Sequence, residues 1–180
     1  MTDAVLARRD VGVAVGIPEP WNGELQGWRE RLGDPNAAGI PPHVTLLPPT
    51  SLHEADIKAV EEHLRVVAAG EQPFTLHLRG SGTFRPVSPV VFVQVIQGIG
   101  ECESLEQQVR RGPLARQLTF PYHPHVTVAH DLPEPALDTA FETLADFDCR
   151  FEASALHLYE HGTDGVWRPE QTFPFAGAKP

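Results

Sequence analysis

The feature that most constrains this sequence is a short phrase that occurs twice. Residues 41–46 read Pro-Pro-His-Val-Thr-Leu and residues 123–128 read His-Pro-His-Val-Thr-Val, with the central histidines 82 positions apart. Two further pairs of segments keep an offset of 80, namely Leu76-His77-Leu78 with Leu156-His157-Leu158, and Val11–Val15 with Val91–Val95. Three ordered markers at nearly constant spacing indicate a duplicated structural unit.

Each copy of the unit shows the same order of elements. β-Branched runs predict an opening strand, an amphipathic pattern predicts a helix, and the His-Val-Thr segment predicts a short second strand. A second helix, which begins in the first copy at a Ser-Leu-His-Glu capping box, and a closing strand complete the unit. The expected strands are 11–17, 74–79, 90–96, 151–160 and 166–175, and the expected helices are 24–32, 51–67, 103–111 and 134–146.

This order of elements predicts the α+β fold class. We expect one bilobal domain over residues 1–180, with repeat one at 11–84 and repeat two at 90–175 related by a pseudo-twofold axis. Mixed or antiparallel sheets would surround a central groove, and the helices would lie outside. If the copies pack in this way, the two His-Val-Thr strands face each other, which brings His43 and His125 together.

Charge and cysteine content exclude several classes of function. The formal net charge is −10, which disfavours coating of duplex nucleic acid because that needs many phosphate-neutralising cations. The two cysteines, Cys102 and Cys149, are too few for a disulfide framework or a zinc knuckle. Neither a signal peptide nor an apolar run of about 20 residues is visible. We therefore expect a cytoplasmic protein without membrane contact.

The repeated His-Val-Thr motif contains the side chains that acid–base chemistry at a phosphate requires. Histidine titrates near neutral pH, and the threonine two positions on projects from the same face of a strand. A phosphate held between two such strands would meet two imidazoles and two hydroxyls. One imidazole could activate a nucleophile while the opposite one protonates the leaving oxygen, as in-line displacement at phosphorus requires. This chemistry needs no metal or other cofactor.

The paired His43-Val44-Thr45 and His125-Val126-Thr127, together with the duplication and the length, resemble the 2H phosphoesterase superfamily, also called the 2′-5′ RNA ligase family. The resemblance implies a bilobal fold and metal-independent chemistry on 2′,3′-cyclic phosphates or 2′-5′ linkages of RNA and nucleotides. It implies that His125 activates water, that His43 protonates the leaving ribose oxygen, and that the hydroxyls of Thr45 and Thr127 hold the phosphate.

One position departs from the family pattern. Many members carry an arginine soon after the second motif, where it helps to neutralise the phosphate, whereas this chain has His130. The phosphate charge would then rest on protonated histidine, including His130, and on hydroxyl donors. We therefore expect modest, pH-dependent affinity and weak ligase activity.

Metal ligation is an alternative use of the histidines in the second repeat. His123 and His125 lie on one side of a strand, and His130 follows closely. The first repeat has Pro41 at the position that matches His123, and no carboxylate cluster completes a ligand set, so we expect no metal site. The matched pair His77 and His157 fits either an exposed strand face or the groove.

Recognition of a nucleobase requires aromatic side chains near the groove. The candidates for base or substrate contacts are Phe84, Arg85, Tyr122, Tyr159 and Trp167. The predicted function is hydrolysis of 2′,3′-cyclic phosphate ends of RNA or of small nucleotides by a monomer. Ligation of 2′-5′ bonds, hydrolysis of another cyclic phosphate such as an ADP-ribose derivative, and nucleotide binding without catalysis are the alternatives.

Overall fold

The computed structural model describes residues 7–179 and contains eight strands and four helices of two or more turns within that range. Residues 1–6 and 180 of the expected domain lie outside the described residues. The helices are α1 (Trp21–Arg31), α2 (Ile57–Ala69), α3 (Ile99–Val109) and α4 (Glu134–Thr143). The strands are β1 (Arg8–Gly16), β2 (His43–His53), β3 (Phe74–Thr83), β4 (Val90–Gln97), β5 (His125–His130), β6 (Asp148–Ala153), β7 (Ala155–His161) and β8 (Trp167–Pro174).

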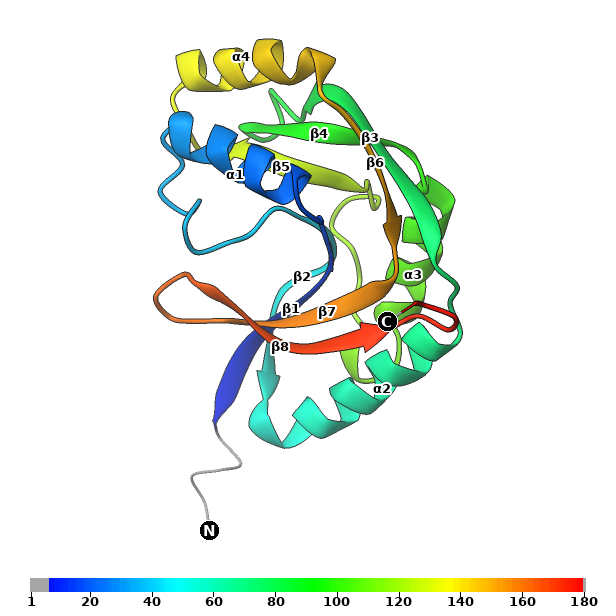
Figure 1. The fold of residues 1–180 in the computed structure, drawn as a ribbon. Helices are drawn as coiled ribbons and strands as arrows, with labels where there is room; N and C mark the ends of the chain where they lie inside the picture. The colour runs from blue at the N-terminus through cyan, green and yellow to red at the C-terminus, as the bar shows by residue number, and fades with distance from the viewer. Residues whose placement is uncertain (1–6, 180) are drawn as a thin grey trace.

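The strands form two four-stranded sheets, with the orders β2-β1-β7-β8 and β5-β4-β3-β6. All six strand pairs in the described residues are antiparallel, which decides between the mixed and antiparallel sheets that we expected. Figure 1 shows both sheets curving around a common centre, with α2 and α4 at opposite ends of the molecule. The α+β class with a duplicated architecture is confirmed.

The two repeats exchange their closing strands. β3 ends repeat one but pairs with β4, the first strand of repeat two. β7, near the end of repeat two, pairs with β1, the first strand of repeat one. The single closing strand that we expected at 151–160 is wrong, because the chain changes sheet at Ser154, between β6 in one sheet and β7 in the other. Each sheet therefore contains strands from both repeats.

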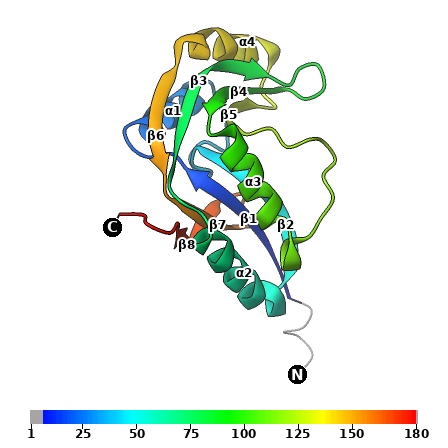
Figure 2. The ribbon, with the colours of Figure 1, turned by 90° about the vertical axis from the view of Figure 1, so that its right-hand side faces the viewer.

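Apolar faces of the sheets and helices form the main core. In α2, buried residues recur every three or four positions, as an amphipathic helix requires, and they are Ile57, Val60, Leu64, Val67 and Ala68. α2 and α3 contact each other, and Figure 2 shows them on the same side of the molecule. α4 covers the second sheet through contacts with β3, β4 and β5.

One expected helix start is wrong. The segment 51–54 does not form a capping box, because β2 extends to His53 and Ser51 pairs with Asp10 of β1. A short 3₁₀ turn at Glu54–Asp56 then leads into α2, whose start lacks a side-chain cap. None of the helices within residues 7–179 has the length and apolar character needed to cross a lipid bilayer.

Candidate active site

The two His-Val-Thr segments begin β2 and β5, the facing edge strands of the two sheets. Val44 and Val126 point into the core and are 0% exposed. The histidine and threonine on either side of each valine are only partly buried, because successive side chains of a strand alternate between faces. The expected sharing of one face by His and Thr is therefore observed in both repeats.

A β-bulge follows each motif. Thr45 pairs with Ala14 and Leu47 pairs with Val13, so two steps along β2 match one step along β1. In the second repeat Thr127 pairs with Phe92, Ala129 with Val91 and His130 with Val90. Two consecutive residues after each threonine are consequently buried. Because paired residues share a face, the second bulge returns His130 to the face that carries His125 and Thr127.

Both motif histidines have the same tautomer. The Nδ1 of His43 lies 2.7 Å from the carbonyl oxygen of Pro41, and the Nδ1 of His125 lies 2.7 Å from the carbonyl oxygen of His123. A carbonyl oxygen can only accept, so each Nδ1 carries the hydrogen and donates it. The Nε2 of each neutral ring is then an acceptor with a free lone pair, which is the form that a general base requires.

The two imidazoles are packed differently. His43 stacks on Trp167 with ring centroids 4.7 Å apart. The ring centroid of His125 lies 5.0 Å from that of Phe84, with the two planes at 89°. The ring centroid of Phe92 also lies 5.0 Å from that of His125. Phe92 itself needs a glycine opposite, since a Cβ on Gly82 would lie 2.5 Å from its ring.

This packing lowers the pKa of both rings. The pKa of His43 is lowered to about 4, mainly by burial, with the charges of Arg29 and His125 adding to the effect and the hydrogen bond to Pro41 opposing it. Burial also lowers the pKa of His125, with a smaller contribution from His123. Because His125 influences the pKa of His43, the two imidazoles lie within range of each other's charge. Both imidazoles are therefore neutral bases at pH 7 in the absence of other charges.

Tyr122 connects the segment that carries His125 to the strand that carries His43. Its hydroxyl donates to the carbonyl oxygen of Thr45 at 2.8 Å, which ties the segment before β5 to β2. Thr45 and His125 line the same cavity of about 680 Å³. This cavity is predominantly apolar in its lining, which also includes Phe84, Tyr122, His123, Arg116, Leu118 and Phe120.

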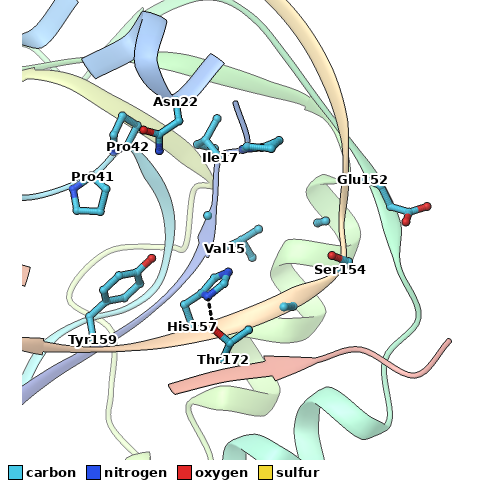
Figure 3. Close-up of a pocket in the computed structure, with 14 residues that line it drawn as sticks. Val15, Ile17, Asn22, Pro41, Pro42, Glu152, Ser154, His157, Tyr159 and Thr172 are labelled. Atoms are coloured by element: carbon cyan, nitrogen blue, oxygen red, sulfur yellow. Dashed lines mark hydrogen bonds between the residues drawn. The ribbon is translucent and has the colours of Figure 1, made fainter. Parts of the chain in front are cut away.

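A second cavity of about 460 Å³ lies next to the prolines that precede His43. Figure 3 shows His157 and Tyr159 of β7 on the same side of the strand, with Asn22 and Pro42 across the cavity. The Nδ1 of His157 lies 3.1 Å from the hydroxyl of Thr172 on β8. His77, the counterpart of His157 in repeat one, is instead paired with Asp148 at 2.8 Å.

The remaining predicted site residues fall into two groups. Phe84, Tyr122, Tyr159 and Trp167 all lie in or beside the site, although Tyr159 and Trp167 are each only 8% exposed. Burial leaves Trp167 little free surface for a base, so its geometry fits positioning of His43. Arg85 forms ion pairs with Glu134 at 2.7 Å and Asp138 at 2.9 Å and is not among the residues that line the cavity beside His125. His130 is exposed beside Asp131.

Three residues of the site were not among the predicted ones. Phe92 contacts His125, Arg116 lines the larger cavity, and the buried Arg29 acts on His43 through its charge. A comparison of the repeats indicates Phe92, because the offset of 80 matches it with Gly12 and only the second repeat has a large side chain there. Arg29 carried no signal, since its position on the buried side of α1 depends on its ion pair with Asp34.

Histidine, cysteine and carboxylate side chains do not come together in groups of three that could hold a metal ion anywhere in residues 7–179. His123, His125 and His130, the ligands of the alternative metal site, therefore do not form such a group.

A family model described as the 2′-5′ RNA ligase superfamily matches residues 17–165, which is more than half of the chain. The chain belongs to the 2′-5′ RNA ligase superfamily. The matched range includes both His-Val-Thr motifs.

Relatives agree with this family assignment. A protein of Geobacillus kaustophilus named "Putative phosphoesterase" is 29% identical over 168 residues, which cover 92% of this chain and 96% of the relative. A Bacillus cytotoxicus protein with the same designation is 27% identical over 165 residues, with coverage of 91% and 95%. The phosphoesterase designation applies to those relatives, and the family assignment makes this chain a phosphoesterase-family protein.

Solved structures show the same fold. LigT of Escherichia coli, crystallised with 3′-AMP, superposes with a TM-score of 0.70 at 21% identity, covering 94% of this chain and 99% of LigT. TT0787 of Thermus thermophilus superposes with a TM-score of 0.61 at 21% identity, covering 94% of this chain and all of that chain.

Proposed function

We propose that the protein hydrolyses 2′,3′-cyclic phosphates at the ends of RNA or on small nucleotides, with His43 and His125 as the proton-transfer pair. The observation that carries the proposal is the matched Nδ1 hydrogen bond of the two rings, which leaves Nε2 of both available to a substrate. Two bases with the same tautomer on facing strands suit an in-line displacement, in which the nucleophile attacks phosphorus from one side and the leaving oxygen departs from the other.

The proposed reaction consumes one water molecule. Neutral His125 takes a proton from water while the water oxygen forms a bond to phosphorus. The ester bond from phosphorus to one ribose oxygen breaks, and protonated His43 gives its proton to that oxygen. The hydroxyls of Thr45 and Thr127 donate to the oxygens that remain on phosphorus. His125 is left protonated and His43 neutral, and exchange with solvent restores the starting state.

This division of roles requires a bound phosphate, because His43 must be protonated to act as the acid. Both rings have a lowered pKa without substrate, and the negative charge of a bound phosphate raises the pKa of each. Arg29 is always charged and lowers the pKa of His43, which makes protonated His43 the stronger proton donor. His130, on the same face of β5 through the bulge, would add positive charge when it is protonated.

The substrate class is supported by the larger cavity and by structural relatives. Its volume of about 680 Å³ and its aromatic lining suit a nucleoside attached to the phosphate, with Phe84 and Tyr122 beside the base. LigT of Escherichia coli, whose fold this chain shares, has been crystallised with 3′-AMP and with NADP⁺.

The test replaces His43 and His125 separately by glutamine and measures hydrolysis of adenosine 2′,3′-cyclic phosphate. Each variant should lose about 10²- to 10⁴-fold in kcat, the usual contribution of a general acid or base. His53→Gln is the matched control, because this exposed histidine lies at the far end of the same strand. Activity within tenfold of wild type in either variant would remove that histidine from proton transfer.

The same assay separates the alternatives. A chelator should leave the rate unchanged, and activity that disappears and returns with added metal contradicts the metal-independent mechanism. Whether the product carries a 2′- or a 3′-phosphate identifies the oxygen that leaves. Faster turnover of a 2′-5′-linked dinucleotide or of an ADP-ribose cyclic phosphate would reassign the substrate. Saturable nucleotide binding without product would assign a binding protein.

A further inference from the structure

Arg116 provides a positive charge in the larger cavity that the proposed chemistry does not use. It belongs to the long loop between α3 and β5, which lies at the right of the view in Figure 2. Its guanidinium donates to the hydroxyl of Thr50 on β2 at 2.8 Å. Within the part of the chain that the structure describes, no carboxylate forms an ion pair with it. A fixed cation without a partner, in a protein of net charge −10, is suited to an anionic ligand.

The loop that carries Arg116 is held in place by a second arginine. Arg110 at the end of α3 donates to the backbone oxygen of Arg116 at 3.1 Å. Arg110 is itself paired with the buried carboxylate of Glu106, at 2.5 Å. Glu106 also lines the cavity, so this ion pair neutralises its negative charge. Arg116 is consequently the positively charged group of the cavity at any pH, whereas His123 and His125 are charged only when protonated.

The distance from the motif indicates which phosphate Arg116 can reach. Thr50 follows Thr45 by five residues on β2, which corresponds to about 15 Å along the strand. Six covalent bonds of about 1.5 Å separate consecutive phosphorus atoms of RNA, so these atoms lie less than about 9 Å apart. The 5′-phosphate of the terminal nucleotide is therefore too close to the reacting phosphorus to contact Arg116. The next phosphate upstream lies at a distance that matches the position of Arg116.

An exposed aromatic side chain lies in the same loop. Phe120 is 67% exposed and lines the cavity together with Arg116. Leu118 and Val87 are also exposed at its edge. A positive side chain combined with a free aromatic face is the usual arrangement for single-stranded nucleic acid, in which the phosphate pairs with the cation and a base stacks on the ring.

We propose that this cavity binds a single-stranded oligonucleotide, with Arg116 on a phosphate upstream of the terminal nucleotide and Phe120 against an upstream base. The inference rests on the proposed function, because it takes the reacting phosphorus to lie between His43 and His125. The physiological substrate is then an RNA end several nucleotides long, and a cyclic mononucleotide fills only the inner part of the site.

The experiment compares adenosine 2′,3′-cyclic phosphate with the di- and trinucleotides ApA and ApApA that end in the same cyclic phosphate. For wild type, kcat/KM should rise with length. The ratio of kcat/KM of wild type to kcat/KM of Arg116→Gln should be about tenfold larger for the trinucleotide than for the mononucleotide. This is the size expected for one exposed charge-assisted hydrogen bond. The salt dependence of log KM for the trinucleotide should become shallower by about 0.7.

Matched variants separate a specific contact from a change of net charge. Arg111→Gln removes the same charge from an exposed position outside the cavity and should leave the length profile of wild type. Arg116→Lys should restore most of the salt dependence. Phe120→Ala should lower kcat/KM for the trinucleotide about tenfold, whereas Phe141→Ala, an exposed residue of α4, should not.

A ratio of wild type to Arg116→Gln that is the same for all three lengths would overturn the inference while leaving the proposed function intact. An equal effect of Arg111→Gln would do the same. If wild type hydrolyses none of the substrates, the proposed function fails. In that case the binding of fluorescein-labelled ApApA with a 3′-phosphate decides the inference, which requires weaker binding by Arg116→Gln than by Arg111→Gln.

Discussion

His43 stacks on Trp167, with ring centroids 4.7 Å apart and planes inclined by 29°. The indole is 8% exposed, and the backbone N–H of Trp167 donates to the carbonyl oxygen of Gly39 at 2.8 Å. Its Nε1 is buried and has no hydrogen-bond partner among residues 7–179, so the indole is positioned by packing. His125 instead lies edge-on to Phe84 at 5.0 Å and stacks on His123 at the longer centroid distance of 6.1 Å. The two halves of the site therefore orient equivalent rings by different means.

Replacement of Trp167 tests this positioning role. In Trp167→Leu the pKa of His43 should rise from about 4 toward its ordinary value, because burial is the main cause of the lowering. The rate kcat should fall between about 10- and 100-fold, since the ring is no longer held in one orientation. NMR titration of the His43 ring gives the pKa, and Trp28→Leu on α1 is the control. An unchanged pKa of His43 contradicts the assignment.

The lowered pKa of His43 predicts how stability depends on pH. The unfolded chain binds a proton at this residue near pH 6.5, whereas the folded protein does so only near pH 4. Between these values the unfolded state binds more protons, so the free energy of unfolding decreases as the pH falls. The loss assigned to His43 is at most about 3 kcal/mol.

Denaturant unfolding at pH 7 and at pH 4.5 measures this loss. His43→Gln cannot bind the proton and should lose less stability over the same interval than wild type does. Because other groups titrate similarly in both proteins, the difference between the two losses of stability gives the contribution of His43. Equal losses in both proteins would show that His43 has its ordinary pKa in the folded state.

Gly82 is predicted to be essential for the position of Phe92. A Cβ at residue 82 would lie 2.5 Å from the Phe92 ring, which packs 5.0 Å from His125. Gly82→Ala should therefore cost about 1–3 kcal/mol through overpacking and lower the turnover as well. Gly100→Ala is the matched control, since nothing lies within 4 Å of its Cβ in α3, and it should be neutral or stabilising. Thermal unfolding and kcat of both variants decide the point.

Arg85 is predicted to anchor a hairpin rather than to bind substrate. Its ion pairs with Glu134 and Asp138 connect the 84–89 turn to α4. Arg85→Gln should therefore change KM for adenosine 2′,3′-cyclic phosphate less than twofold and increase hydrogen exchange in the 84–89 turn. The same measurement with Glu134→Gln should show the same increase. A large rise in KM confined to Arg85→Gln would restore the original prediction of a substrate contact.

Several features of the protein could be predicted from local patterns. The duplication, the order of strands and helices, and the shared face of histidine and threonine all depend on residues close together in the chain. The strand at 90–96 and the helix at 134–146 agree closely with β4 and with α4 and its 3₁₀ extension. The pairing of the two motifs across a groove required the duplication as an additional argument, since no local pattern records it.

By itself, the sequence determined that two equivalent histidine-threonine strands exist, because alternation along a strand is a local property. Only the tertiary structure decided how they differ. The change of sheet at Ser154, the bulge that turns His130 to the groove face, and the rings that cover His43 and His125 depend on contacts between distant segments. Such contacts depend on which side chains fill the space between the packed sheets. Trp167 contacts His43 for that reason, although more than a hundred residues of chain separate them.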